Sequence, residues 1–200
     1  MKSTITTRSG KPIQGPAFVQ KLFSNPWAGL LWLPIRVWLG WQWLEAGLHK
    51  FASPAWMQTG VALKGFWAAA VAIPATGQAP IHYAWYRSFL QMMIDTQAYT
   101  WFAKLVTLGE IAVGIGMILG IFAGFSSFMG GVMNWAYIMA GSASVNPMFL
   151  VLEVLLVVAW KVSGFFGADY FLLPWVYGLF EKKSTVTEKA TVKAPKGAQA

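Results

Sequence analysis

The residues of this sequence most able to do chemistry are ionisable side chains that stand inside long apolar runs or at their ends. The carboxylates are Glu45, Glu110 and Glu153, and the basic groups are Arg36, His49, Lys50 and Lys104. Burial in apolar surroundings favours the neutral form of a carboxylate, which suits proton-coupled chemistry. An ionisable group at mid-bilayer costs about 2.5–3.5 kcal/mol on insertion scales, so such groups face the interior of a bundle and pair there.

The depth of each group along its apolar run indicates which groups can meet. At a rise of 1.5 Å per residue, Glu45 and Glu153 lie ~9 Å and Glu110 ~14 Å from the outer ends of their runs. Lys104 lies at ~5 Å, and Arg36 is deeper, at ~22 Å. The groups predicted to form one cluster in the outer half of the membrane are Glu45, His49, Lys104, Glu110 and Glu153.

The same groups also fit a purely structural interpretation as ion pairs. The pairs that it predicts are Glu45 with Lys104 and Arg36 with Glu110. Lys50 lies at the end of its run, so its side chain is expected to extend to the surface. At the outer end of the bundle, the carboxylates outnumber the basic side chains that could pair with them inside the membrane. At least one carboxylate is therefore expected to lack a full partner.

Four apolar runs must position these residues. They cover about 27–51, 101–122, 125–141 and 147–164, and an apolar helix of about 20 residues crosses a ~30 Å hydrocarbon core. The chain is 56% apolar and only 11% charged, whereas soluble chains hold roughly a quarter charged residues. The sequence therefore predicts an all-α integral membrane four-helix bundle.

The segments around these spans predict the topology. The loop 52–100 contains two stretches too short to cross a membrane, which indicate short helices at the outer interface. We interpret 1–26 as a basic arm, 27–181 as one domain and 182–200 as a disordered tail. Four spans place both termini on one side, and the basic tails assign that side to the cytoplasm of a cell membrane. The loop 52–100 is then an extracytoplasmic insertion.

Helical periodicity divides the first span into two faces. One stripe holds Arg36, Gly40, Trp43, Gly47 and Lys50, and the opposite one holds Trp38, Trp41, Glu45 and His49.

Small and polar residues mark the later spans. Gly116, Gly120 and Gly124 predict a seam for close helix contact. Asn134 is predicted to point at a neighbouring helix, and Asn146, just before Pro147, is typical of an N-cap.

Composition narrows the possible cofactors and partners. The chain has no cysteine, which excludes disulfides and Cys-ligated iron–sulfur clusters within it. With only two histidines, neither a haem nor a metal site is expected. Basic residues gather in the two tails rather than along a stripe, so a nucleic acid is not an expected partner.

The order and spacing of these residues resemble the DoxX family of four-helix membrane proteins. Arg36-x3-Gly40-x6-Gly47-x2-Lys50 resembles its first-helix signature, and Gly109-Glu110 followed by Gly114 and Gly120 resembles its second. Asn134, the Asn146-Pro147 turn and Gly164-x4-Asp169 resemble its later landmarks, so the resemblance covers residues 28–170. The long insertion at 52–100 makes the chain resemble the DoxD-like branch of this family more closely. Members of that branch are the membrane subunit of thiosulfate:quinone oxidoreductase.

The resemblance implies a quinone-linked oxidoreductase subunit that passes electrons from thiosulfate to quinone, with quinone as a diffusible substrate. The carboxylates Glu45, Glu110 and Glu153 are then the catalytic candidates. The candidates for quinone or anion binding are Arg36, His49, Lys50, Lys104, Asn134 and Asn146. A non-catalytic scaffold for a larger complex is the alternative, and a small-solute path is a third. A partner subunit or a homo-oligomer is expected in addition to the lipid bilayer.

Overall fold

The apolar runs fold into helices, and the computed structural model describes residues 15–178 of the chain. Within that range no residue is in a strand. The elements in chain order are α1 (Ala17–Ser24), the 3₁₀ turn η1 (Pro26–Ala28), α2 (Gly29–Phe51), α3 (Pro54–Met57), α4 (Val61–Val71), α5 (Ala84–Asp95), α6 (Tyr99–Leu119), α7 (Ala123–Met139), α8 (Asn146–Val158) and α9 (Trp160–Ser163). Residues 169–178 are also helical.

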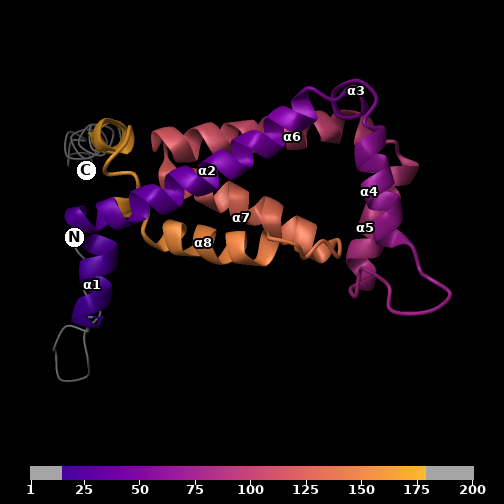
Figure 1. The fold of residues 1–200 in the computed structure, drawn as a ribbon, viewed down its shortest axis with the longest axis horizontal. Coiled ribbons are helices and arrows are strands. Elements are labelled where there is room, and N and C mark those ends of the chain that lie inside the picture. Colours follow the sequence, from indigo (N-terminus) through magenta and orange to yellow (C-terminus); the bar gives the residue numbers. More distant parts are fainter. Residues whose placement is uncertain (1–14, 179–200) are drawn as a thin grey trace, which may run out of the picture.

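The long helices α2, α6, α7 and α8 lie along one another as a bundle, with α6 beside α2 and α7 beside α8 (Figure 1). The pair α4 and α5 runs across one end of this bundle (Figure 1). Helix α1 and the helical residues 169–178 lie at the opposite end (Figure 1). The first and last described segments are therefore at the same end of the bundle, which is the arrangement that an even number of spans predicts.

The predicted apolar runs are confirmed as helices, with small shifts at their ends. The run predicted at 27–51 is α2, which begins two residues later, and the run at 101–122 is α6. The fourth run is interrupted at Ala159, where α8 ends and the short α9 follows. The two short helices predicted in the loop 52–100 are α4 and α5.

Part of the predicted basic arm 1–26 is helical. Residues Ala17–Ser24 form α1, and the indole nitrogen of Trp32 donates to the carbonyl of Leu22 at 2.9 Å. An apolar helix face held against α2 therefore begins the described chain. The predicted tail 182–200 lies outside the described residues.

Glycines allow α2 and α6 to approach at backbone distance. A Cβ at Gly40 would lie 2.8 Å from the Cβ of Met117, and one at Gly114 would lie 2.6 Å from the backbone nitrogen of Leu44. A Cβ at Gly47 would lie 2.9 Å from the backbone nitrogen of Ile111. Small residues that let two helix backbones come this close are typical of membrane helix pairs.

The seam predicted along Gly116, Gly120 and Gly124 is wrong. Helix α6 ends at Leu119, and Gly120 is its C-cap in the left-handed conformation with φ 68°, which glycine adopts without steric cost. Gly124 already belongs to α7 and faces Trp160. Glycine spacing alone does not distinguish a helix interior from a helix end followed by a turn.

Two apolar clusters hold the molecule together. One fills the bundle, and its buried members include Trp32, Leu39, Trp43, Met117 and Leu156. The other joins α4 and α5 to the end of the bundle, and its buried members include Leu63, Trp67, Ile81, Tyr86 and Leu90.

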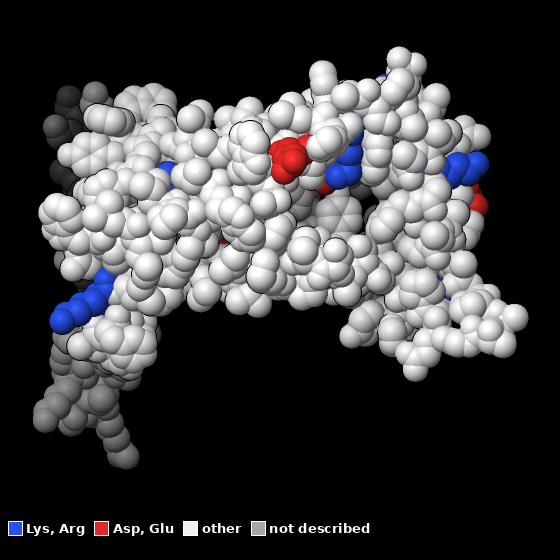
Figure 2. Space-filling view, in the orientation of Figure 1, with Lys and Arg blue, Asp and Glu red and all other residues white. Residues whose placement is uncertain are grey.

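The outward faces of the long helices are also apolar. Large apolar side chains that are exposed there include Leu31, Trp41, Leu105, Leu108, Ile115, Phe125, Phe128, Val132, Val151, Val154 and Val158. Most of the face seen in Figure 2 carries no charged atoms. Exposed apolar surface of this extent marks contact with lipid or another protein. Among the described helices, α6 is the one long and apolar enough to cross a membrane by length and composition.

We expect Gly114→Ala to destabilise the protein by about 1–3 kcal/mol, because the added methyl group must push the backbone of α2 away. Gly109→Ala is the matched control in the same helix, since its Cβ would lie 3.7 Å from the sulfur of Met133. The control should be neutral or slightly stabilising because alanine favours a helix. Thermal unfolding of both purified variants checks this, and equal stability of the two would contradict the packing argument.

Candidate functional site

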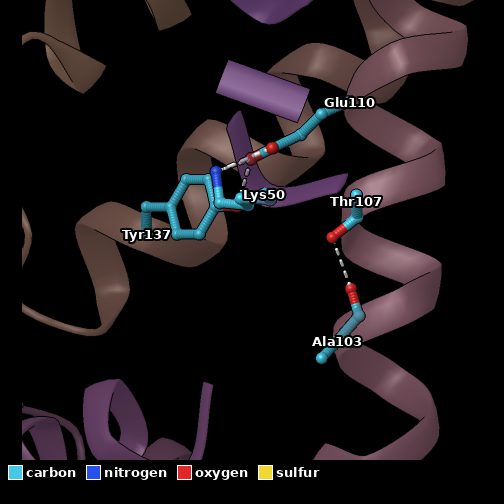
Figure 3. Close-up of polar contacts among 5 residues, drawn as sticks. All are labelled: Lys50, Ala103, Thr107, Glu110 and Tyr137. Atoms are coloured by element: carbon cyan, nitrogen blue, oxygen red, sulfur yellow. Dashed lines mark hydrogen bonds and ion pairs between the residues drawn. The ribbon is translucent and has the colours of Figure 1, made fainter. Parts of the chain in front are cut away.

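The candidate site is centred on Glu110, whose side chain is 1% exposed. The Lys50 ammonium donates to both carboxylate oxygens of Glu110, at 2.8 Å to Oε1 and 2.7 Å to Oε2. The Tyr137 hydroxyl donates to Oε1 at 2.7 Å. The three side chains come from α2, α6 and α7 and converge in the bundle interior (Figure 3).

The close contact of α2 with α6 explains how Lys50 reaches Glu110. A Cβ at Gly47 would lie 3.1 Å from the Cβ of Glu110, so the two helices almost touch one turn from Lys50. One turn away on α6, the Thr107 hydroxyl donates to the carbonyl of Ala103 at 2.9 Å (Figure 3). Thr107 is therefore satisfied within its own helix and does not compete for Glu110.

A cavity of about 390 Å³ opens beside this triad. The side chains that line it are Trp38, Gln42, Trp43, Ala46, Lys50, Glu110, Asn134, Tyr137, Val145, Asn146, Met148 and Phe149. Its wall thus combines an ammonium group, a carboxylate, a phenol and three amides with aromatic and aliphatic surface. A few convergent polar groups in a mostly apolar concavity are typical of a small-molecule site.

A second buried carboxylate, Glu153, stands behind the cavity wall. Trp43 Nε1 donates to its Oε1 at 2.8 Å, and Asn134 Nδ2 donates to its Oε2 at 2.8 Å. The prediction that Asn134 points at a neighbouring helix is confirmed, because Glu153 belongs to α8. Both donors also line the cavity, so Glu153 fixes the orientation of two wall residues.

The predicted pair of Arg36 with Glu110 is wrong. Arg36 is buried at the far end of α2, where its Nη2 donates to the carbonyl of Phe166 at 3.3 Å. Its guanidinium group also packs against Gly120 and Gly167. The helices of Arg36 and Glu110 are neighbours, but Arg36 lies deeper along the bundle, so the antiparallel packing of α6 puts the end of α6 beside it and not Glu110.

Asp169 organises the same end of the bundle. Its carboxylate accepts hydrogen bonds from the backbone nitrogens of Phe122 at 2.6 Å and Ala123 at 2.8 Å. Asp169 therefore caps the start of α7 from a distant part of the chain. Burial raises the pKa of this carboxyl above its ordinary value, while the two backbone N–H groups and the charge of Arg36 act in the opposite direction.

Three members of the predicted outer cluster do not line the cavity beside Glu110. Glu45 and His49 are exposed on the outer face of α2, with His49 Nε2 4.0 Å from Glu45 Oε1. Lys104 is exposed on α6. The only other ion pair within 4.0 Å among the described residues is Lys50 with Glu110, so the predicted pairing of Glu45 with Lys104 is also wrong.

Two further predictions about single residues need correction. Lys50 does not extend to the surface, because it turns inward to Glu110 and its side chain is 21% exposed. Asn146 is the first residue of α8 rather than its cap, and its Nδ2 donates back to the carbonyl of Ser142 at 2.8 Å. It still lines the cavity, as the site prediction required.

Tyr137 and Trp43 were missing from the predicted site residues. Tyr137 follows Asn134 by three residues, so it shares a helix face with a residue already singled out. Trp43 lies on the buried stripe of α2, between Gly40 and Gly47. A polar-tipped aromatic residue on a buried helix stripe is therefore the signal that would have found both, since such groups need a partner when buried.

The chain has no match among protein-family models, curated proteins or solved structures.

We expect Lys50→Met to lower the free energy of unfolding by about 1–3 kcal/mol, because Glu110 keeps its buried charge but loses two of its hydrogen bonds. Combining Lys50→Met with Glu110→Gln should recover part of this loss, since the buried charge is removed as well. Lys104→Met is the control at an exposed position. Thermal unfolding in detergent measures all three, and an equal effect of Lys50→Met and Lys104→Met would contradict the assigned ion pair.

We expect Asp169→Asn to destabilise the protein by about 1–3 kcal/mol, because the amide cannot accept from both N–H groups at the start of α7. Asp95→Asn, at an exposed position where Gln91 is the partner, serves as the control. Circular dichroism during thermal unfolding is the measurement. A variant as stable as the wild type would show that the cap contributes nothing.

Proposed function

We propose that this protein is a multi-pass membrane subunit of a quinone-linked oxidoreductase, and that the cavity beside Glu110 binds the quinone head group. The observation that carries the proposal is a buried carboxylate, held by Lys50 and Tyr137, on the wall of a cavity of about 390 Å³.

Helix length and surface support the membrane part of the proposal. At 1.5 Å per residue, α2, α6 and α7 are about 25–35 Å long, which matches a ~30 Å hydrocarbon core. The helices α8 and α9 together cover 146–163 and supply the fourth crossing. Their outward faces are apolar, and the buried ionisable groups Arg36, Glu110 and Glu153 point inward, as the cost of exposing charge to lipid requires.

The chemistry of the cavity supports a quinone. Reduction of a quinone to a quinol takes two electrons and two protons, and hydrogen-bond donors must meet its carbonyl oxygens. Lys50 and Asn134 line the cavity, and each has one N–H beyond those that it donates to Glu110 and Glu153. One proton can pass from the Lys50 ammonium through Glu110 to a quinone oxygen, and the second must be taken up from water. The aromatic surface of Trp43 and Phe149 suits the quinone ring.

The electrons must come from outside the chain. Two thiosulfate anions release two electrons when they join as tetrathionate, which balances one quinone. The resemblance to the DoxX family, and to its DoxD-like branch, favours this donor. A partner subunit is the other electron source that the proposal allows.

A scaffold function is the second candidate, and one surface favours it. Helix α5 has three exposed apolar side chains on its outer side, Trp85, Phe89 and Met92, at 59%, 42% and 50% exposure. Exposed apolar side chains that share one helix face are candidates for contact with a partner subunit. A permeation path fits less well, because Leu39, Trp43 and Met117 fill the bundle axis beyond the cavity.

Quinone binding to the purified protein tests the proposal. We expect Glu110→Gln and Tyr137→Phe each to weaken binding about tenfold, since a lost buried hydrogen bond is worth ~1–3 kcal/mol. Glu45→Gln makes the same chemical change at an exposed position and should bind like the wild type. A wild-type protein that binds no quinone, alone or with a co-purifying partner, would reject the proposal. Loss of a partner through Trp85→Ser with quinone binding intact would add the scaffold function.

A further inference from the structure

The cavity beside Glu110 has an open side between α2 and α8. One rim is formed by Trp38, Gln42 and Ala46, which follow one another at helical spacing on α2. The other rim is formed by the first residues of α8, among them Met148 and Phe149. Figure 2 shows a hollow between these two helices, next to α4 and α5, with basic and acidic atoms near its rim.

The end of the bundle nearest the cavity is covered. Lys50 Nζ lies 5.2 Å from the ring centre of Trp56 in α3, and the ring of Phe66 in α4 packs edge-on against Tyr137 at 6.1 Å. The hydroxyl of Tyr86 in α5 donates to the carbonyl of Ala136 at 2.9 Å. The layer α3–α5 thus contacts two of the three residues of the Glu110 triad and lies across the axial exit.

The inner end is filled by side chains. Trp43 and Leu39 are 4% and 0% exposed, and Met117 is 0% exposed. The bond from Trp43 to Glu153 fixes this floor in place. With both axial directions occupied, the gap between α2 and α8 is the direction in which the cavity opens.

The gap faces sideways, across the long axis of the bundle, and not toward its ends (Figure 1). Trp38 is 43% exposed and Met148 is 51% exposed, so the rims continue into the apolar outer surface. Trp38 and Phe149 meet across the gap with ring centres 5.5 Å apart and the rings edge-on. This aromatic pair lines the same cavity as Glu110.

We infer that the cavity is a lateral portal, which admits a lipid-dissolved ligand from the membrane between α2 and α8. The ligand has a polar head that reaches Glu110 and an apolar tail that lies in the groove over Trp38 and Phe149. The identity of the ligand rests on the proposed function, and its class is a quinone with a long isoprenoid tail. A water-soluble anion would instead need an opening through the layer α3–α5.

Spin labelling tests the portal without any ligand. The sequence has no cysteine, so Gln42→Cys gives a single labelling site on the rim in the full chain. In liposomes, we expect this label to collide with dissolved oxygen and not with an aqueous nickel complex. Val151→Cys is the lipid-facing control on α8, and Thr76→Cys is the water-facing control between α4 and α5. A Gln42 label that behaves like Thr76, or one shielded from both reagents, would overturn the portal.

Tail length tests the ligand class. We expect a decyl-tailed benzoquinone to bind at least about tenfold more tightly than the same head group without a tail, because the groove buries the tail. Ala46→Trp should block the groove and remove most of this difference, whereas Ala112→Trp, on the outer face of α6, should preserve it. Equal binding of both quinones would overturn the tail groove and leave the proposed function standing. If neither quinone binds the wild type, the proposed function fails, and the spin-label result still decides the portal.

Discussion

The constraint on which this structure depends is that a carboxylate inside an apolar bundle must have its oxygens satisfied by neighbouring helices. Glu110 meets this requirement through Lys50 and Tyr137, which come from the two helices beside its own. The bond to Lys50 exists only because Gly47 lets α2 lie against α6 at backbone distance. The polar site therefore depends on the close glycine packing of α2 against α6. Bulky residues at these glycines would separate the Lys50 ammonium from the Glu110 carboxylate.

The same packing explains where the cavity lies. Glycines allow α2 to pack closely against α6, while Trp38 and Gln42 on another side of α2 line the cavity that faces α8. Helix α8 is held instead to α7, where Asn134 reaches Glu153 across the interface. The bundle consists of two close helix pairs, and the space between the pairs becomes the groove. Small residues along the facing sides of both pairs would have let the pairs pack together and would have closed the groove.

Much of this fold was predictable from the sequence, because burial follows helical periodicity. The stripe from Arg36 to Lys50 was predicted as one face of α2, and its members are buried or half-buried. The ion pairs were not predictable. Depth along each helix fixes the level of a side chain but not the direction in which it points, and Glu45 and Lys104 are both exposed although their helices pack together. Arg36 and Glu110 lie at different depths, and Arg36 meets the end of α6 instead. The cap of α7 by Asp169 joins residues 46 and 47 positions apart, a contact that no local pattern encodes.

The two buried carboxylates have different surroundings, and this difference separates their roles. Glu110 has a cation and a phenol as partners and lies on the cavity wall, so a ligand can exchange protons with it directly. The side-chain partners of Glu153 are an indole and an amide, both neutral donors. Its carboxylate orients Trp43 and Asn134, which in turn shape the cavity. Glu110 is thus placed for chemistry, whereas Glu153 acts as a positioning residue through the two side chains it holds.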